Sequence, residues 1–211
     1  MTRKYEITDI QQLENPKLFR IRALRDIPRF GVKQGDVGGY IEHEGNLSQE
    51  GECWISDDAR VFGKAHVHGN AHVHAKAMVF NSAQVFENAI VFENATVFEN
   101  AQVHGNAKVH GKAMVFNNAR VYGNAQVFGS AQVYENAQIY DNAWVNDRSQ
   151  VYGEVVVNKN MSISGWSHIS SPGQIYYSDG VTAYFDLAGD LISAGDTLEI
   201  EHHKTLARLT L

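Results

Sequence analysis

The sequence has little cysteine, no long apolar run and no excess of basic charge. Its single cysteine, Cys53, excludes a disulfide framework and a cysteine-based zinc finger. No run of about 18 apolar residues occurs and the start is not a charged and then apolar segment, so neither a membrane span nor a secretory signal is expected. The 18 basic residues against 24 acidic ones argue against duplex nucleic acid as a partner. We therefore expect a soluble, cytoplasmic protein.

A six-residue period dominates the middle of the chain. Valine or isoleucine stands at every sixth position from Ile55 to Val181, 22 times in succession. A second column has alanine at every sixth position from Ala59 to Ala143, fifteen times. A short fixed period of this kind is typical of a solenoid, in which each unit buries its apolar face only against its neighbours.

The spacing also predicts the geometry of one unit. Side chains alternate along a strand, so the alanine and the valine of each hexad point inward together and the residues between and after them point outward. The remaining two residues, such as Gly69-Asn70 or Glu93-Asn94, must turn a corner, and asparagine tolerates the left-handed backbone conformation that sharp corners need. A narrow triangular coil of three strands, one from each of three hexads, follows.

These residues resemble a known family. A valine followed four residues later by alanine is similar to the hexapeptide repeat of left-handed parallel β-helices, a family best known from acyltransferases. The resemblance covers residues 53–181 and implies an all-β, left-handed parallel β-helix of about seven triangular coils. The strand spacing of about 4.8 Å gives the solenoid a length of roughly 34 Å.

The two ends differ from the repeats and are expected to be caps. Residues 1–52 contain an alternating segment, 18–24, that predicts a strand, and then the Gly-rich turn segment 35–41. The latter resembles the entry module of uncharacterised bacterial and prophage hexapeptide-repeat proteins. Residues 182–211 contain a predicted strand pair around Gly189-Asp190 and, from Asp196, a predicted terminal helix. Each cap would cover the open core and strand edges at one end of the 53–181 solenoid.

The outward residue that follows each valine is unusual. It is aromatic or histidine in fifteen of the sixteen hexads between positions 62 and 152. With three hexads per coil this column divides into three ladders along the solenoid. The candidate binding surface comprises Phe62, Phe80, Phe98, Phe116, Tyr134 and Tyr152 in the first ladder, Phe86, Tyr122 and Tyr140 in the second, and Phe92 and Phe128 in the third. Apolar faces of this size indicate a contact with a second copy or another macromolecule.

Histidines interrupt the second and third ladders. His66 and His68 lie on one predicted strand, and His72 and His74 repeat the pattern on the next, so each pair could hold a surface metal ion. The preferred interpretation is that histidine replaces phenylalanine in the ladder, because no Cys, Asp or Glu is placed to complete a tetrahedral site. Cys53 occupies the alanine column and is predicted to be a small buried residue.

The sequence therefore predicts a rigid, non-catalytic β-solenoid that acts as a protein-binding or self-assembly module, as a homo-oligomer or with a protein partner. The prophage resemblance implies a binder of a host protein. The alternative is an acyl-CoA-dependent transferase working as a trimer, with His104, His110 or His168 as general base. Glycan or base stacking on the aromatic ladders also stays open. The main interpretation needs no cofactor and assigns no catalytic residue; acyl-CoA enters only under the alternative.

Overall fold

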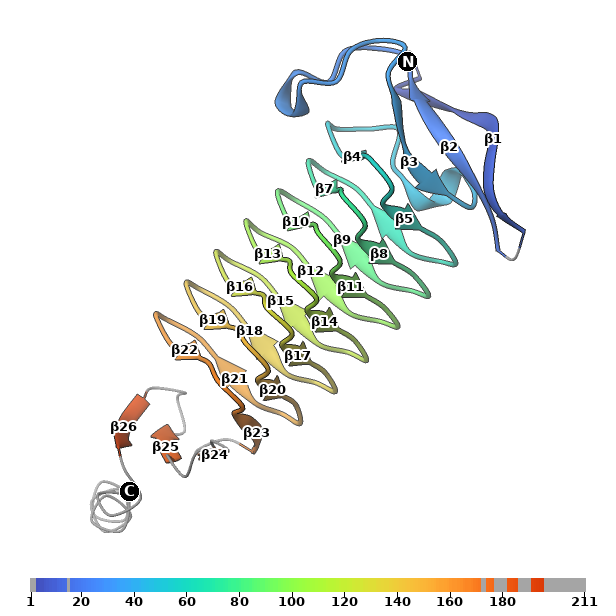
Figure 1. The fold of residues 1–211 in the computed structure, drawn as a ribbon. Coiled ribbons are helices and arrows are strands. Elements are labelled where there is room, and N and C mark those ends of the chain that lie inside the picture. The colour runs from blue at the N-terminus through green and yellow to red at the C-terminus, as the bar shows by residue number, and fades with distance from the viewer. Residues whose placement is uncertain (1–2, 15, 172–173, 177–181, 186–190, 196–211) are drawn as a thin grey trace.

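The computed structural model describes residues 3–14, 16–171, 174–176, 182–185 and 191–195. Most of the regular structure there is β-strand, and short parallel strands stack into three sheets around one long axis (Figure 1). The chain moves to the next sheet with every hexad, so three hexads make one coil, and about seven coils are stacked. The expected all-β, parallel β-solenoid is confirmed.

The three sheets have different lengths. The six-stranded sheet contains β6 (His66–Val67), β9 (Gln84–Val85), β12 (Gln102–Val103), β15 (Arg120–Val121), β18 (Gln138–Ile139) and β21 (Val156–Val157). The seven-stranded sheet contains β4 (Trp54–Ile55), β7 (His72–Val73), β10 (Ile90–Val91), β13 (Lys108–Val109), β16 (Gln126–Val127), β19 (Trp144–Val145) and β22 (Ser162–Ile163). The thirteen-stranded sheet, called the long sheet below, contains β5 (Arg60–Val61), β8 (Met78–Val79), β11 (Thr96–Val97), β14 (Met114–Val115), β17 (Gln132–Val133), β20 (Gln150–Val151) and β23 (His168–Ser171) together with strands of both caps.

Neighbouring coils pair without any shift in register. Each residue of a parallel strand lies beside the residue at the same hexad position one coil later, as Val61 lies beside Val79 and Val79 beside Val97. Identical hexad positions are therefore stacked directly above one another along the whole solenoid. This is why a period in the sequence becomes a set of straight columns in space.

The interior is built from the two apolar columns. Every alanine of the column from Ala59 to Ala143 and every column valine or isoleucine from Ile55 to Val151 is fully buried. Burial of one valine side chain contributes about 1.5 to 3 kcal/mol, so the stacked column supplies much of the stability. Later coils put Ser149, Val155 and Ser167 in the alanine column, and these residues are also buried.

The corners correct one expectation. The left-handed backbone falls on the first corner residue, with φ of 67° at Gly69 and 59° at Glu93, rather than on the asparagine that follows. The asparagine instead forms a side-chain ladder from coil to coil. One corner has Asn70, Asn88, Asn106, Asn124, Asn142 and Asn160 in a single chain of amide hydrogen bonds. At the second corner position, asparagine therefore serves pairing between coils, whereas Asn81 and Asn117 at the first position do adopt the left-handed backbone.

The N-terminal end is closed by β1 (Tyr5–Glu14), β2 (Lys17–Ala23) and β3 (Val37–Ile41), with short 3-10 helices at Pro28–Phe30 and Glu44–Asn46. The strand expected at 18–24 is β2. The segment 35–41, expected as a turn, contains β3, which pairs antiparallel with β2 and parallel with β5. A Cβ on Gly39 would lie 2.4 Å from Cγ2 of Ile55, so two glycines let β3 approach the first coil.

A buried polar contact joins this cap to the solenoid. The side chain of Lys4 is fully buried, and its Nζ lies 3.0 Å from Sγ of Cys53 and donates to the carbonyl of Glu50 at 3.2 Å. Burial lowers the pKa of Lys4 and raises the pKa of Cys53. Burial therefore opposes charge on both groups, and Cys53 is a buried thiol, as its place in the alanine column predicts.

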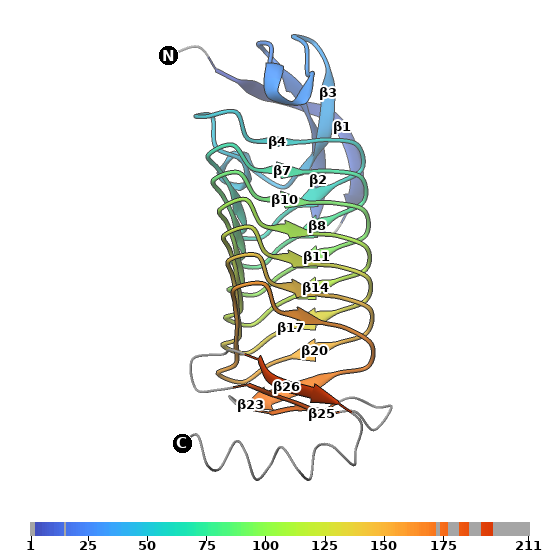
Figure 2. The same ribbon diagram turned by 90° about the vertical axis from the view of Figure 1, so that its left-hand side faces the viewer.

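The C-terminal end continues the long sheet with antiparallel strands. β24 (Gln174–Tyr176) pairs with β23, β25 (Thr182–Phe185) with β24, and β26 (Leu191–Gly195) with β25 (Figures 1 and 2). The expected strand pair is present, and parallel stacking ends with β23. The helix expected from Asp196 lies outside the described residues.

Among the described residues, no helix has the length and apolar character needed to cross a bilayer.

Candidate functional site

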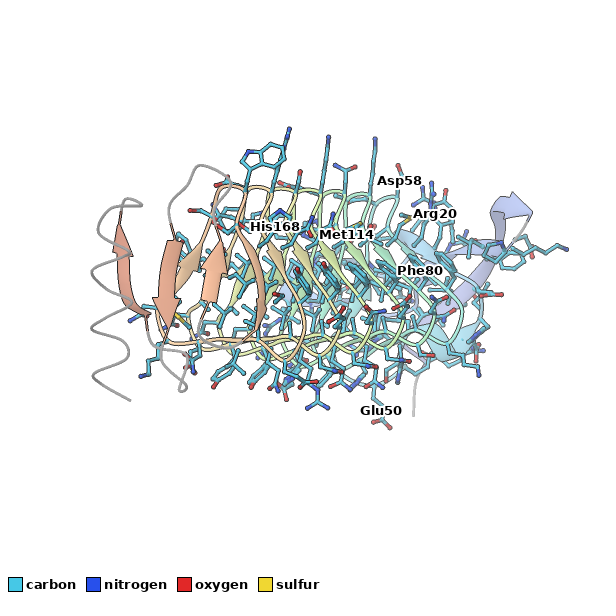
Figure 3. The ribbon with its side chains drawn as sticks, turned by 90° about the horizontal axis from the view of Figure 1, so that it is seen from below. Arg20, Glu50, Asp58, Phe80, Met114 and His168 are labelled. Atoms are coloured by element: carbon cyan, nitrogen blue, oxygen red, sulfur yellow. The ribbon has the colours of Figure 1, made fainter. Side chains whose placement is uncertain are left out.

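The outward side chains of the solenoid come from two positions in each hexad. One is the residue between alanine and valine, and the other is the residue after valine, because both alternate with the buried columns. Each sheet therefore presents two parallel columns to the outside. Figure 3 looks onto the long sheet, with Phe80 and Met114 on the exposed side of the coils and Asp58 at one edge.

The first aromatic ladder lies on the long sheet. Phe62 and Phe80 stack with ring centroids 5.0 Å apart and an interplanar angle of 3°, and the stacking continues to Tyr134 and Tyr152 at 4.8 Å. The intervening pairs have the same geometry. All six rings are half-buried, because each covers the faces of its neighbours. A partner molecule would meet ring edges and not ring faces.

The other two ladders mix histidine with the aromatic residues. On the six-stranded sheet the stack runs through His68, Phe86, His104, Tyr122 and Tyr140. On the seven-stranded sheet it runs through His74, Phe92, His110 and Phe128, where Trp144 meets Phe128 edge-on at 6.1 Å. The structure brings every predicted ladder residue into its predicted column.

This geometry bears on the stacking of a ligand. A sugar ring or a nucleobase stacks on an uncovered aromatic face. Inside each ladder both faces of a ring are already covered, as Phe98 is by Phe80 and Phe116. Ligand stacking along the columns would require separation of rings that lie about 5 Å apart, so the ladders are poorly suited to it.

Acidic residues at the corners have a role that the sequence did not reveal. Glu87 has positive φ, and its Oε2 accepts a hydrogen bond of 2.7 Å from the backbone amide of Gly105 in the next coil. The same bond joins Glu93 to Gly111 at 2.6 Å and Glu135 to Gly153 at 2.8 Å. The bond from the next coil offsets the cost of a left-handed backbone in a non-glycine residue. The sequence signal for these three bonds was a glycine 18 residues, or one full coil, after the acidic corner residue.

The histidine pairs lie near the N-terminal cap. The rings of His72 and His74 stack at 4.5 Å with 23° between their planes, and Phe30 stacks on the other face of His72 at 4.2 Å. Oγ of Ser56 lies 2.9 Å from Nε2 of His72. Burial, and secondarily the neighbouring His74, lowers the pKa of His72 to about 4. His72 is thus a neutral, packed residue that anchors the loop carrying Phe30.

The candidate metal ligands do not form a larger cluster. His66 and His68 are tilted by 32° with centroids 4.8 Å apart, and they face a different side of the solenoid from His72 and His74. In the described part of the chain, no group of three or more His, Cys, Asp or Glu residues is arranged to hold a metal ion. His68 and His74 each begin a ladder, as the ladder interpretation predicts, whereas His66 and His72 lie in the neighbouring outward column.

Two of the three histidines considered as general bases, His104 and His110, are packed between rings, whereas His168 is exposed. The ring of His104 lies between Phe86 and Tyr122, and that of His110 lies between Phe92 and Phe128. Their Nδ1 atoms each lie 3.7 Å from a corner carboxylate of the preceding coil. His168, at the start of β23, pairs with Gln150. His104 and His110 therefore have packing partners of their own.

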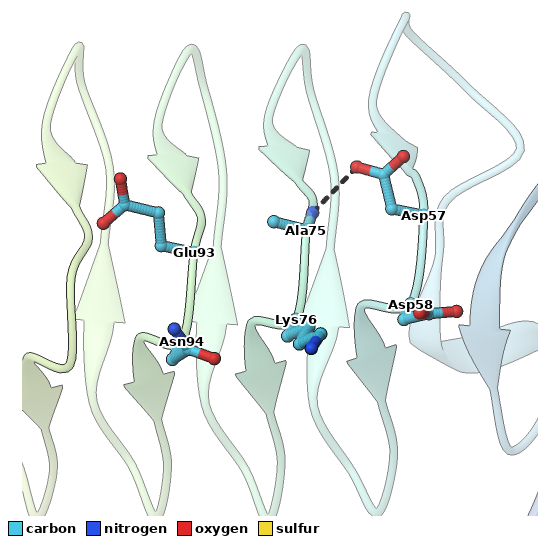
Figure 4. Close-up of a pocket in the computed structure, with 6 residues that line it drawn as sticks. All are labelled: Asp57, Asp58, Ala75, Lys76, Glu93 and Asn94. Atoms are coloured by element: carbon cyan, nitrogen blue, oxygen red, sulfur yellow. Dashed lines mark hydrogen bonds between the residues drawn. The ribbon is translucent and has the colours of Figure 1, made fainter.

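A hollow at one corner gathers several charged groups (Figure 4). Its lining consists of Asp57, Asp58, Ala75, Lys76, Glu93 and Asn94. Asp57 accepts a hydrogen bond of 2.9 Å from the amide of Ala75, and Asp58 pairs with Arg20 at 2.7 Å. Glu93 accepts from the next coil as described above. The carboxylates are therefore engaged in holding coils and cap together.

The three faces differ in charge. The long-sheet face, defined as the outward residues from β8 to β20, has no ionisable group of either sign apart from two tyrosines. It consists of Met78, Phe80, Thr96, Phe98, Met114, Phe116, Gln132, Tyr134, Gln150 and Tyr152. The six-stranded face carries Arg120 and His104 over the same coils, and the seven-stranded face carries Lys108 and His110. The long-sheet face is the surface best suited to a macromolecular contact.

Comparison with known families agrees with the fold. The model of the YdcK beta solenoid repeat matches residues 55–69, 119–135 and 137–153. A search of curated proteins found no significant match. The matched repeats are therefore similar to a β-solenoid family and carry no assignment of activity.

Proposed function

We propose that this chain is a rigid, non-catalytic contact module that binds a protein surface through the long-sheet face. The main support for the proposal is that the two outward columns of the long-sheet face, from β8 to β20, are straight and carry no charged residue. Ring edges, methionines and side-chain amides alternate there over five coils. Such a mixture resembles the core of a protein interface, where charged residues are depleted and aromatic residues and methionine are enriched.

The rigidity of the solenoid favours this use. Binding costs free energy when side chains must be ordered, and rings held in a ladder have little freedom left to lose. The backbone is fixed by hydrogen bonds to the coils on both sides, such as Phe98 N to Val115 O at 3.0 Å. A partner of matching shape would therefore lose little affinity to reorganisation of this surface.

The finer parts of the expected function belong to the same proposal. A left-handed winding and a prophage origin rest on the resemblance of the hexads and of the 35–41 segment. An acyltransferase would need an accessible base in a cleft, whereas His104 and His110 are packed between rings. The packing of His104 and His110 favours the contact module over a transferase that would use either of them as its base.

Triple substitution tests the proposed face. Phe80, Phe98 and Phe116 become serine in the first variant, and the matched control places serine at Phe86, His104 and Tyr122 on the six-stranded face of the same coils. Native mass spectrometry of each protein, isolated gently from its own host, reports complexes with a second copy or another chain. We expect the first variant to lose the complex by at least about 100-fold in affinity, since three buried rings each contribute more than about 1 kcal/mol.

The control should retain the complex. Circular dichroism checks that both variants keep the β-spectrum. Equal complex formation by both variants, or none by the wild type, would contradict the proposal.

A further inference from the structure

Two corners of opposite charge border the long-sheet face. At the corner where the chain enters the long sheet, the last corner residue is basic and exposed in three coils. These residues are Lys76 before β8, Lys112 before β14 and Arg148 before β20. At the corner where the chain leaves the long sheet, the first corner residue is acidic in two coils. These residues are Glu99 after β11 and Glu135 after β17. We call these the basic ridge and the acidic ridge. They run parallel to the solenoid axis on either side of an uncharged strip.

Acidic residues also occur beside the basic ridge. Asp58 holds the same corner position before β5, where it pairs with Arg20, and the others lie farther from the face. Glu93 and Asp147 hold the first position of their corners, on the side of the seven-stranded sheet. Each accepts a backbone amide of the next coil, from Gly111 at 2.6 Å and from Gly165 at 2.9 Å. Glu93 and Asp147 lie one residue farther from the long sheet than the corner position that the basic residues hold, so the lysine and arginine side chains are the charges nearest to a partner there.

The two ridges are spaced alike. Successive basic residues are 36 positions apart, and so are Glu99 and Glu135, which corresponds to two coils or roughly 10 Å. The acidic set is offset from the basic set by one coil, so Glu99 and Glu135 bracket the level of Lys112 along the axis. In the described part of the chain, no ion pair involves these ridge residues.

We propose that the long-sheet face binds a second copy of this chain with the two solenoids parallel, an inference that rests on the proposed function. The two-fold axis would run along the solenoid. Such an axis reverses left and right across the face and keeps the height of each coil. The basic ridge of one copy then lies against the acidic ridge of the other, on both sides of the interface.

The same operation matches the uncharged strip. The column between alanine and valine of one copy faces the ring column of the other at equal height. Thr96 then faces Phe98 of the second copy, and Met114 faces Phe116. Further along, Gln132 faces Tyr134, so uncharged methionine and threonine side chains meet rings in the first coils and amides meet phenol hydroxyls in the later ones. An antiparallel arrangement would instead place basic ridge on basic ridge, which is repulsive.

The area predicts the strength of the dimer. A face of five to seven strands and one hexad width presents roughly 500 Å², so two copies bury about 1,000 Å², at the lower limit of specific interfaces. We therefore expect a reversible dimer that dissociates on dilution. Because the ridges lie at the solvent-exposed rim, the dimer should weaken as sodium chloride increases.

Reversal of the basic ridge tests the pairing. We expect K76E/K112E to raise the dimer dissociation constant at least about tenfold in sedimentation equilibrium, since each change replaces attraction by repulsion on both sides. The matched control is K108E/R120E, which changes net charge equally but lies on the other two faces. It should leave the dissociation constant within about twofold.

A complementary variant guards against a simple folding failure. E99K/E135K alone should likewise have a raised dimer dissociation constant, and mixing it with K76E/K112E should restore tight association as a heterodimer because opposite charges again meet across the interface. Glu99 and Glu135 each accept a backbone amide of the next coil, so thermal melting of each variant is measured alongside. Recovery on mixing cannot come from an unfolded chain.

The orientation is tested by cross-linking. In a parallel dimer every level of the face meets its own copy, so T96C and Q132C should each form a homodimeric cross-link with a short bismaleimide. In an antiparallel dimer, only a residue at the height of the two-fold axis meets the same residue of the second copy. At least one of the two variants would then form no homodimeric cross-link. Cys53 is buried and does not compete.

The outcomes separate this inference from the proposed function. A wild type that stays monomeric overturns the second copy as partner. If the phenylalanine triple variant still loses a complex with another protein, the contact face is nevertheless supported. A dimer that is lost in the triple variant but unchanged in K76E/K112E overturns the ridge pairing alone. A dimer unaffected by either overturns both proposals.

Discussion

The two ends of the solenoid differ in how completely their buried polar groups are paired. At the N-terminal end the fully buried Asn46 donates to the carbonyls of Gly63 and Ala65, each at 2.9 Å, and accepts from two backbone amides. Toward the C-terminal end, Oδ1 of Asn146 and Oγ of Ser149 are buried without a partner. The first coil is joined to its cap by hydrogen bonds of specific side chains. The last coils continue the repeat but contain buried polar atoms without hydrogen-bond partners.

The largest expected effect comes from removing the polar contacts at the N-terminal end. Replacing Asn46→Ala leaves the carbonyl of Ala65 and the amides of Glu42 and His43 without this partner, so we expect a loss of roughly 3 kcal/mol in the free energy of unfolding. The same change at the other end, Asn146→Ala, should cost less than about 1 kcal/mol. Urea unfolding of the two variants measures both values, and similar losses would remove the distinction between the ends.

A second prediction concerns pH at the N-terminal coils. His72 has a folded pKa of about 4, below the ordinary value of 6.5. The unfolded chain therefore takes up a proton between pH 6.5 and 4 that the folded chain does not. Stability from this group is full above pH 6.5 and falls as pH drops toward 4, by roughly 3 kcal/mol. Thermal melts at several pH values measure the slope, and His72→Gln should flatten it.

The outcome depends on the groups packed around His72. Phe30 and Ser56 bury it, His74 opposes its protonation and Asp57 favours it. An NMR titration of the His72 ring gives its pKa directly. A value near 6.5 would contradict the enclosed environment described for this loop.

The smallest effect sharpens the comparison at the C-terminal coils. Ser149 occupies the alanine column with an unpaired hydroxyl, so Ser149→Ala should stabilise the protein by about 1 kcal/mol. Ser167 occupies the same column, but its hydroxyl donates to the carbonyl of Ser164. Ser167→Ala should therefore give no gain. Differential scanning calorimetry compares the two, and an equal rise in melting temperature would show that the hydrogen bond is unimportant.

The fold could be predicted from the sequence because its repeat is defined by residues that lie close together in the chain. An alanine and a valine two residues apart determine which side chains point inward, and repetition in every hexad leaves few ways to bury them. The aromatic ladders follow from the same arithmetic, since position 62 must lie beside position 80 once three hexads make a coil. These parts required no knowledge of contacts between distant residues.

The parts that sequence reasoning missed depend on contacts between coils or with the caps. The left-handed backbone falls on the first corner residue whatever its type, as at Gly69, Ala75 and Glu93, and the amide that Glu93 meets in the next coil could not be read from its own hexad. The packing of Phe30 on His72 joins a cap loop to a coil much later in the chain. The strand β3 replaced an expected turn because Gly38 and Gly39 pack against the first coil, which their local sequence does not reveal.

The unshifted register between coils has a consequence for insertions and deletions. Removing or adding three whole hexads would shorten or lengthen the molecule by one coil and return every later residue to its former side. A change of a single hexad would preserve the buried columns but turn everything downstream by one third of a revolution. The chain would then fold with its basic ridge broken between two corners. Length variation in this architecture is therefore quantised, with one complete coil as the smallest step that keeps its surfaces intact.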